Sequence, residues 1–154
     1  MNGPREDGAF LALRHRPEGS LDIGELLVAA RANGFAGRSS AYFNDSAIRA
    51  FAARLAEYPL PDGNAPAISG GTSDLGGGNY TELVGITVAP SESRGQLAVR
   101  VHLAESWSSR GDAKHEVRLE LLTTYERLRT FSEDLARVVN GGQSEAVLGE
   151  EVLA

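Results

Sequence analysis

Apolar and polar residues alternate along much of the chain, and this pattern predicts β-strands. The first strand is expected over residues 9–15, and two more flank Asn33-Gly34, the dipeptide favoured in two-residue hairpin turns. Residues 83–89 and 96–107 predict a second hairpin, and residues 115–122 predict a strand that returns from it. Together these segments indicate a meander, in which consecutive strands pair with each other.

One register of the second hairpin places six apolar residues on the same face, because directly opposed residues of an antiparallel pair share a face. The opposed pairs are Val88 with Leu97, Ile86 with Val99, and Val84 with Val101. The next strand continues this face with Val117, Leu119 and Leu121, the first of them opposite Val101. The other face carries polar residues, so the sheet is expected to have one buried and one solvent-exposed face.

Two stretches have the roughly 3.6-residue period of amphipathic helices. The first runs from the candidate caps Asp45 and Ser46 to a stop before Pro59, and the second from Thr123 or Thr124 to a pair of glycines. Their apolar stripes are Ile48, Phe51, Leu55 and Tyr58 in the first helix, and Leu128, Phe131, Leu135 and Val138 or Val139 in the second. The shared spacing fits a duplicated strands-then-helix unit, but we favour convergence, since any half-buried helix needs such spacing.

These elements predict an α+β fold, in which one antiparallel meander sheet of about six to seven strands carries two amphipathic helices on one face. The chain has 154 residues, of which 42% are apolar, and this suits a single domain spanning residues 1–154. Within it, a flexible glycine-rich loop is expected at about residues 69–80 and a C-terminal tail at about residues 140–154.

Composition and charge exclude several classes of function. The chain has no cysteine, which excludes thiol catalysis, cysteine-ligated zinc and iron–sulfur clusters. Its net charge is −6 and its arginines are dispersed, with Lys114 the single lysine, so nucleic acid is not expected as a partner. The polar N-terminus lacks the apolar core of a secretory signal, and no apolar run reaches the roughly 18 residues of a membrane-spanning helix. We therefore expect a cytoplasmic protein without a membrane partner.

The glycine-rich stretch at residues 68–85 does not match a nucleotide-binding loop. A P-loop needs a lysine and a Ser or Thr after its last glycine and then a helix, whereas a strand-like segment without lysine follows here. In the expected register His102 faces solvent opposite Glu116 and His115 faces the core opposite Leu103, so the two make a poor metal pair. The G-x-S-x-G motif of serine hydrolases is absent. The sequence thus predicts no catalytic residue, no metal site and no cofactor, although paired carboxylates would leave no local signature.

The solvent-exposed face of the sheet carries the candidate binding residues. Glu116, Arg118 and Glu120 share this face with Arg100 and His102 of the neighbouring strand. Such alternating charge is ordinarily a solvated ladder. The alternative is a recognition surface, because arginine and tryptophan are enriched at binding hot spots. The predicted surface consists of Arg100, His102, Arg118 and Glu120, with Trp107 at the tip of the hairpin.

Three segments, GRSSAYFNDSAIRAFAARLAEYPL, GQLAVRVHL and YERLRTFSEDL, together resemble small bacterial immunity proteins of the WapI-like type over about residues 34–139. In that group a hairpin leads into a helix of the pattern L-x-x-F-x-x-x-L, a meander follows, and a second helix comes late. The resemblance implies a non-catalytic protein that binds and blocks a toxin domain, and it carries no catalytic residue onto this chain. The runner-up is a small ligand-binding domain or enzyme whose pocket lies between sheet and helices, gated by the glycine-rich loop. A homo-oligomeric accessory subunit is a third interpretation.

Overall fold

The computed structural model describes residues 8–61, 63–73, 80–91, 95–105 and 115–149. Eight strands and two helices form in these ranges, which confirms the predicted α+β class. In chain order they are β1 (Phe10–Pro17), β2 (Ile23–Ala32), β3 (Phe35–Asn44), α1 (Asp45–Leu55), β4 (Ala67–Ser73), β5 (Tyr80–Pro90), β6 (Leu97–Ala104), β7 (Glu116–Thr123), α2 (Tyr125–Val139) and β8 (Ala146–Gly149).

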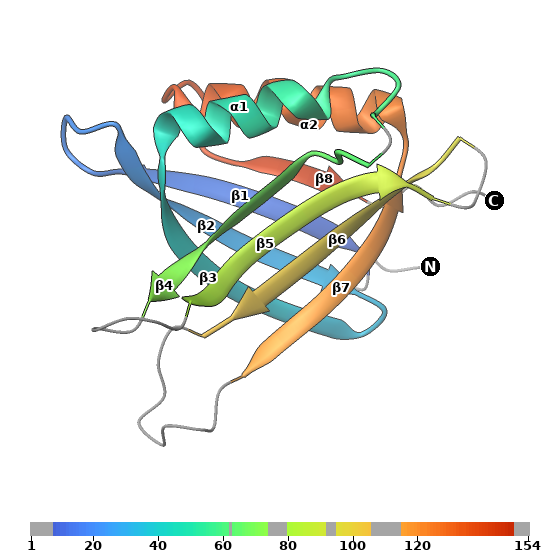
Figure 1. Ribbon diagram of the computed structural model, residues 1–154, viewed down its shortest axis with the longest axis horizontal. Helices are drawn as coiled ribbons and strands as arrows, with labels where there is room; N and C mark the ends of the chain where they lie inside the picture. The colour runs from blue at the N-terminus through green and yellow to red at the C-terminus, as the bar shows by residue number, and fades with distance from the viewer. Residues whose placement is uncertain (1–7, 62, 74–79, 92–94, 106–114, 150–154) are drawn as a thin grey trace, which may run out of the picture.

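The strands form two four-stranded antiparallel sheets, so the prediction of a single meander sheet was wrong. Sheet A has the strand order β3-β2-β1-β8 and sheet B the order β4-β5-β6-β7 (Figure 1). The meander is broken because α1 stands between β3 and β4, and these strands then belong to different sheets. The helices lie side by side across the top of Figure 1, where α1 packs on β3 and β4, and α2 packs on β8 and β1. They therefore contact both sheets rather than one face of one sheet.

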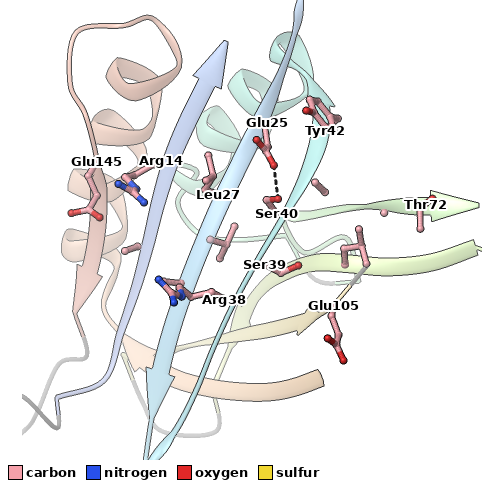
Figure 2. Close-up of a pocket in the computed structure, with 16 residues that line it drawn as sticks. Arg14, Glu25, Leu27, Arg38, Ser39, Ser40, Tyr42, Thr72, Glu105 and Glu145 are labelled. Atoms are coloured by element: carbon pink, nitrogen blue, oxygen red, sulfur yellow. Dashed lines mark hydrogen bonds between the residues drawn. The ribbon is translucent and has the colours of Figure 1, made fainter. Parts of the chain in front are cut away.

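Each sheet has an inner face that is buried and an outer face that is open to solvent. In β2 every second residue from Gly24 to Ala32 is buried, and the residues between them are partly exposed. The side chains of Arg14, Leu27 and Arg38 lie on the outer face of sheet A (Figure 2). This alternation is the period of two that the sequence shows, and it places the apolar set of each strand against the opposite sheet.

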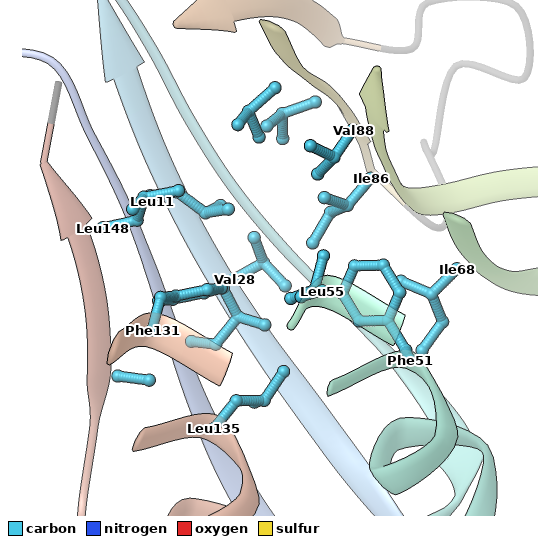
Figure 3. Close-up of a cluster of buried hydrophobic side chains, with 14 of the residues drawn as sticks. Leu11, Val28, Phe51, Leu55, Ile68, Ile86, Val88, Phe131, Leu135 and Leu148 are labelled. Atoms are coloured by element: carbon cyan, nitrogen blue, oxygen red, sulfur yellow. The ribbon is translucent and has the colours of Figure 1, made fainter. Parts of the chain in front are cut away.

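The inner faces of the sheets and one stripe of each helix form a single hydrophobic core (Figure 3). Phe51 and Leu55 of α1 and Phe131 and Leu135 of α2 are at most 3% exposed. The stripe predicted for α2 is confirmed, since all its members are buried: Leu128, Phe131, Leu135, Val138 and Val139. Side chains thus fill the space between the helices and the sheets.

The ends of the two helices differ in how well the sequence predicted them. Thr124 caps α2 as expected, because its side chain accepts a hydrogen bond from the Arg127 amide (3.3 Å). The N-cap of α1 is Asn44, one residue before the predicted candidates, and its side chain makes no capping bond. Helix α1 also ends at Leu55, so Tyr58 is not part of the apolar stripe and is 78% exposed. The residue before a proline is disfavoured in helical conformation, and the helix ends ahead of that restriction at Pro59.

The hairpins place the predicted residues on the inner face, although the pairing differs by two residues in the second hairpin. Asn33 and Gly34 both have positive φ (52° and 84°), as the type I′ turn requires. In the second hairpin Val88 opposes Val99 rather than Leu97, because pairing continues toward the turn as far as Pro90 opposite Leu97. Val101 likewise opposes Leu119 rather than Val117. A shift of two residues keeps every side chain on its face, so the predicted core residues still face inward; all are buried except Val117, which is partly buried against the core.

Two segments predicted to be irregular contain strands. Residues 67–73 form β4, which takes up the start of the predicted glycine-rich loop, while residues 74–79 of that loop lie outside the described residues. Within the predicted C-terminal tail, residues 146–149 form β8 on the edge of sheet A. Ala146 and Leu148 face the core and are at most 2% exposed. This part of the tail prediction was wrong because so short a strand shows no clear alternation: apolar Val147 stands between the two inward-facing residues.

The two halves of the molecule share one topology. In each half four antiparallel strands lie side by side and the fourth leads into a helix, in the order β8-β1-β2-β3-α1 and β4-β5-β6-β7-α2, although β8 follows α2 in the chain. Their registers correspond, because Leu13 is opposed by Ala146 and Val28 as Ile86 is opposed by Ile68 and Val101. The helices meet at corresponding residues, where Ser132 Oγ donates to the Ala52 carbonyl oxygen (2.6 Å). The outer faces of sheets A and B are therefore equivalent surfaces.

Candidate functional site

Four of the five predicted binding residues lie together on the outer face of sheet B. Arg100 and His102 come from β6 and Arg118 and Glu120 from β7, and all four line a groove of about 470 Å³. Trp107, the fifth, lies outside the described residues. We call six residues the sheet B charge cluster. They are Arg100, His102, Arg118 and Glu120, together with Glu82 and Glu116, whose contacts are described below.

Neighbouring charges in this groove are paired. Arg100 Nε donates to Glu120 Oε2 (3.0 Å) directly across the strands. His102 opposes Arg118 rather than the predicted Glu116, but its Nε2 still lies 2.6 Å from Glu116 Oε1. Arg118 is 3.9 Å from the same Glu116 oxygen. The charges therefore form a continuous ladder across β6 and β7.

Glu82 completes the surroundings of His102, and it was not among the residues predicted from the sequence. His102 Nδ1 lies 2.7 Å from Glu82 Oε1, so both ring nitrogens contact a carboxylate. In a regular strand Glu82 would share the inner face with Val84, Ile86 and Val88. A β-bulge in the β4–β5 pairing, where Gly70 opposes Val84 and Gly71 opposes Glu82, turns Glu82 outward instead.

Two glycines make this arrangement possible. A Cβ atom on Gly71 would lie 1.9 Å from the Thr81 carbonyl oxygen, so no other residue fits the bulge without moving the backbone. A Cβ atom on Gly85 would lie 2.5 Å from the Glu82 carboxylate, which occupies the space above that glycine. The Gly70-Gly71 pair inside a strand is the sequence signal that could have identified the bulge, and with it Glu82.

Hydrogen bonds fix the charge state of Glu82. Partial burial alone would raise its pKa. The hydrogen bonds from Ser69 and His102 and the charges of His102 and Arg118 outweigh burial and hold the pKa of Glu82 below its ordinary value. Ser69 Oγ donates to Glu82 Oε2 (2.5 Å) and lies 3.0 Å from the Tyr80 hydroxyl. The carboxylate is thus held ionised in one position.

The hydrogen bonds of Ser69 and His102 lead to carboxylates. Ser69 donates to Glu82, so the arrangement is not the Ser–His pair of a serine hydrolase. Both ring nitrogens of His102 contact carboxylates, those of Glu82 and Glu116. Within the described ranges, no group of three or more His, Asp or Glu residues could hold a metal ion.

The other two histidines lie away from this groove. His115 was expected on the inner face, but it precedes β7 and its side chain is 92% exposed beside Glu105 (2.7 Å). The backbone and side-chain hydrogen bonds from His115 lower the pKa of Glu105. His15 is buried and contacts Asp45 at the start of α1 (2.8 Å), in a space left open by Gly24. Neither histidine joins the sheet B charge cluster.

Comparison of the chain with protein-family models, with curated proteins and with solved structures finds no match in any of the three. The resemblance to WapI-like immunity proteins therefore remains a prediction. Neither of the two described helices combines the length and the apolar character that crossing a membrane requires.

Proposed function

We propose that the chain is a non-catalytic binding protein that engages a protein partner through the outer face of sheet B. The resemblance to immunity proteins suggests that the partner is a toxin domain, which this chain would block by covering it. The observation that carries the proposal is the convergence of Arg100, His102, Arg118 and Glu120 in one solvent-facing groove.

The groove is preorganised for recognition. Two of its charged pairs, Arg100–Glu120 and His102–Glu82, are already hydrogen-bonded, so these side chains lose little freedom when a partner binds. Arginine side chains that keep unused donors are frequent hot spots in protein interfaces. Charges of both signs alternate across the face, and such a pattern favours one partner orientation over others.

The alternative of a ligand pocket between sheets and helices gains no support from the described core. Phe51, Leu55, Phe131 and Leu135 occupy that space and are at most 3% exposed. Two grooves lie on the outer faces of the sheets, and a third, of about 640 Å³, lies between β1 and the C-terminal end of α2. We therefore place binding on the outside of the sheets.

An affinity pull-down of the tagged chain from native lysate at moderate salt, read by mass spectrometry, tests the proposal. We expect one stoichiometric partner, whose affinity falls by about tenfold or more in an Arg118→Ala variant, as for a hot-spot arginine. Arg129→Ala is the matched control, because Arg129 is an exposed arginine on α2 and outside the groove. If Arg118→Ala and Arg129→Ala bind the partner equally well, the sheet B charge cluster is not the interface. Light scattering of the purified chain measures in parallel whether it self-associates.

A further inference from the structure

The outer face of sheet A carries a second groove, of about 770 Å³ (Figure 2). Its floor consists of the small or apolar outer residues Ala12, Leu27 and Ala29, and Tyr42, 58% exposed, stands at its side. This volume is in the range of sites that bind small molecules, which are mostly apolar with a few placed polar groups.

Two arginines flank the apolar floor. Arg14 on β1 and Arg38 on β3 are exposed and line the groove from either side of β2. Neither forms an ion pair with any described residue. Each guanidinium can therefore donate hydrogen bonds to a ligand in the groove.

The carboxylates that line the groove are mostly engaged elsewhere. Glu25 accepts from Arg16 (2.9 Å) and from Ser40 (2.6 Å), and Glu105 is bound by His115. Glu145 is the remaining carboxylate of the lining; it lies beside Arg14 in Figure 2 but forms no ion pair within the described part of the chain. Glu145 is thus the group that would compete with a bound anion.

The corresponding groove of sheet B has carboxylates beside its arginines at positions where sheet A has uncharged residues. On sheet A, Ala12, Ala29 and Arg38 lie directly opposite one another on β1, β2 and β3. The corresponding residues of sheet B are Gly85, His102 and Arg118 on β5, β6 and β7. On sheet B the neighbouring Glu116 lies 3.9 Å from Arg118, and Glu120 neutralises Arg100. The corresponding residues on β3 are Ala36 and Ser40, which carry no charge. The arginines of sheet B thus contact carboxylates, whereas Arg38 of sheet A forms no ion pair with a described residue.

We propose that the groove on sheet A is a binding site for a small organic acid with an apolar body. The acid group would accept charge-assisted hydrogen bonds from Arg38 and Arg14, and the apolar body would lie on Leu27 and Ala29 beside the ring of Tyr42. The site is separate from the protein interface proposed on sheet B.

Titration of the isotope-labelled protein with octanoate, followed by amide chemical shifts, tests this site. 1-Octanol is the matched neutral probe, because it has the same hydrocarbon chain and no negative charge. We expect octanoate to shift amides of β1, β2 and β3 and to bind at least about tenfold more tightly than octanol, the factor that one charge-assisted hydrogen bond contributes.

Three variants test which charged side chains determine the affinity for octanoate. Arg38→Gln should weaken octanoate binding by about tenfold, and Arg129→Gln, which removes the same charge from α2, should leave it unchanged. Glu145→Gln should strengthen binding, since it removes the competing carboxylate. Amide spectra of each variant without ligand show whether it is folded. Equal affinities for octanoate and octanol, shifts confined to other strands, or equal effects of Arg38→Gln and Arg129→Gln would each overturn the proposal.

Discussion

Replacing Gly71 by alanine tests the bulge that turns Glu82 toward His102. The added Cβ atom would lie 1.9 Å from the Thr81 carbonyl oxygen, whereas ordinary van der Waals contact begins at 3.4 Å. The two backbones must separate by about 1.5 Å to restore that contact, the difference between these distances. No rotamer change relieves the clash, because both atoms belong to the backbone or are fixed to it.

We expect Gly71→Ala to lower the free energy of unfolding by about 2–3 kcal/mol, the upper part of the usual range for overpacking. The edge position of β4 keeps the loss from being larger, since the strand can shift on its free side. For a chain of this size the loss corresponds to a fall in Tm of about 4–12 °C. In the folded variant the pKa of Glu82 should return toward its ordinary value, because the carboxylate leaves His102 and Ser69.

Urea denaturation of the two proteins, with Gly149→Ala as the matched control, measures this effect. A Cβ atom on Gly149 meets no atom within 4 Å, so alanine there should be neutral or stabilise β8 by up to about 1 kcal/mol. If Gly71→Ala and Gly149→Ala are equally stable, the bulge does not depend on glycine. If Gly71→Ala is destabilised but the pKa of Glu82 is unchanged, the bulge does not position this carboxylate.

Three further predictions concern the described core and the pH dependence. Thr123 Oγ1 is buried and has no hydrogen-bond partner among the described residues, so Thr123→Val should raise stability by about 1 kcal/mol in urea denaturation; a loss would show that the hydroxyl is satisfied. Ser132→Ala should cost about 1 kcal/mol, because it removes the hydrogen bond to the Ala52 carbonyl between the helices, and an unchanged midpoint would contradict this. The pKa of Glu82 is lowered in the folded state, so its stabilisation is complete above its unfolded pKa and is lost as pH falls through the folded pKa. The stability difference between wild type and Glu82→Gln should therefore shrink on acidification, and a constant difference would refute the role of the ionised carboxylate.

The inner faces of the strands could be predicted from the sequence, because burial depends on which alternate positions of a strand point inward and not on which residues they pair with. Val84, Ile86 and Val88 are buried although their predicted partners were two residues away. The Asn33-Gly34 turn was predictable because few dipeptides adopt positive φ at both positions. The division into two sheets was not, since alternation shows which residues face inward but not which strands pair across a helix.

The candidate site was predictable where the strands are regular. Arg100, His102, Arg118 and Glu120 share a face because side chains alternate in β6 and β7. Glu82 was missed because the β-bulge in the β4–β5 pairing turns its side chain to the outer face. The regular alternation of inward and outward side chains does not continue across such a bulge. The groove on sheet A was missed because it depends on which arginines lack a partner, and pairing is visible only in three dimensions.

The position of β8 has a consequence for the growing polypeptide. Sheet A is begun by β1 and completed by β8, which follows seven strands and two helices along the chain; Leu148 of β8 pairs opposite Leu11, and Ala146 pairs opposite Leu13. Sheet B can form without a strand from a distant part of the chain, because β4 to β7 follow one another in the sequence. During synthesis the edge of β1 is therefore open for as long as the rest of the described chain takes to emerge. An exposed strand edge is a template for pairing with other chains. The step most exposed to aggregation or to chaperone capture is thus the docking of the four-residue strand β8 onto β1.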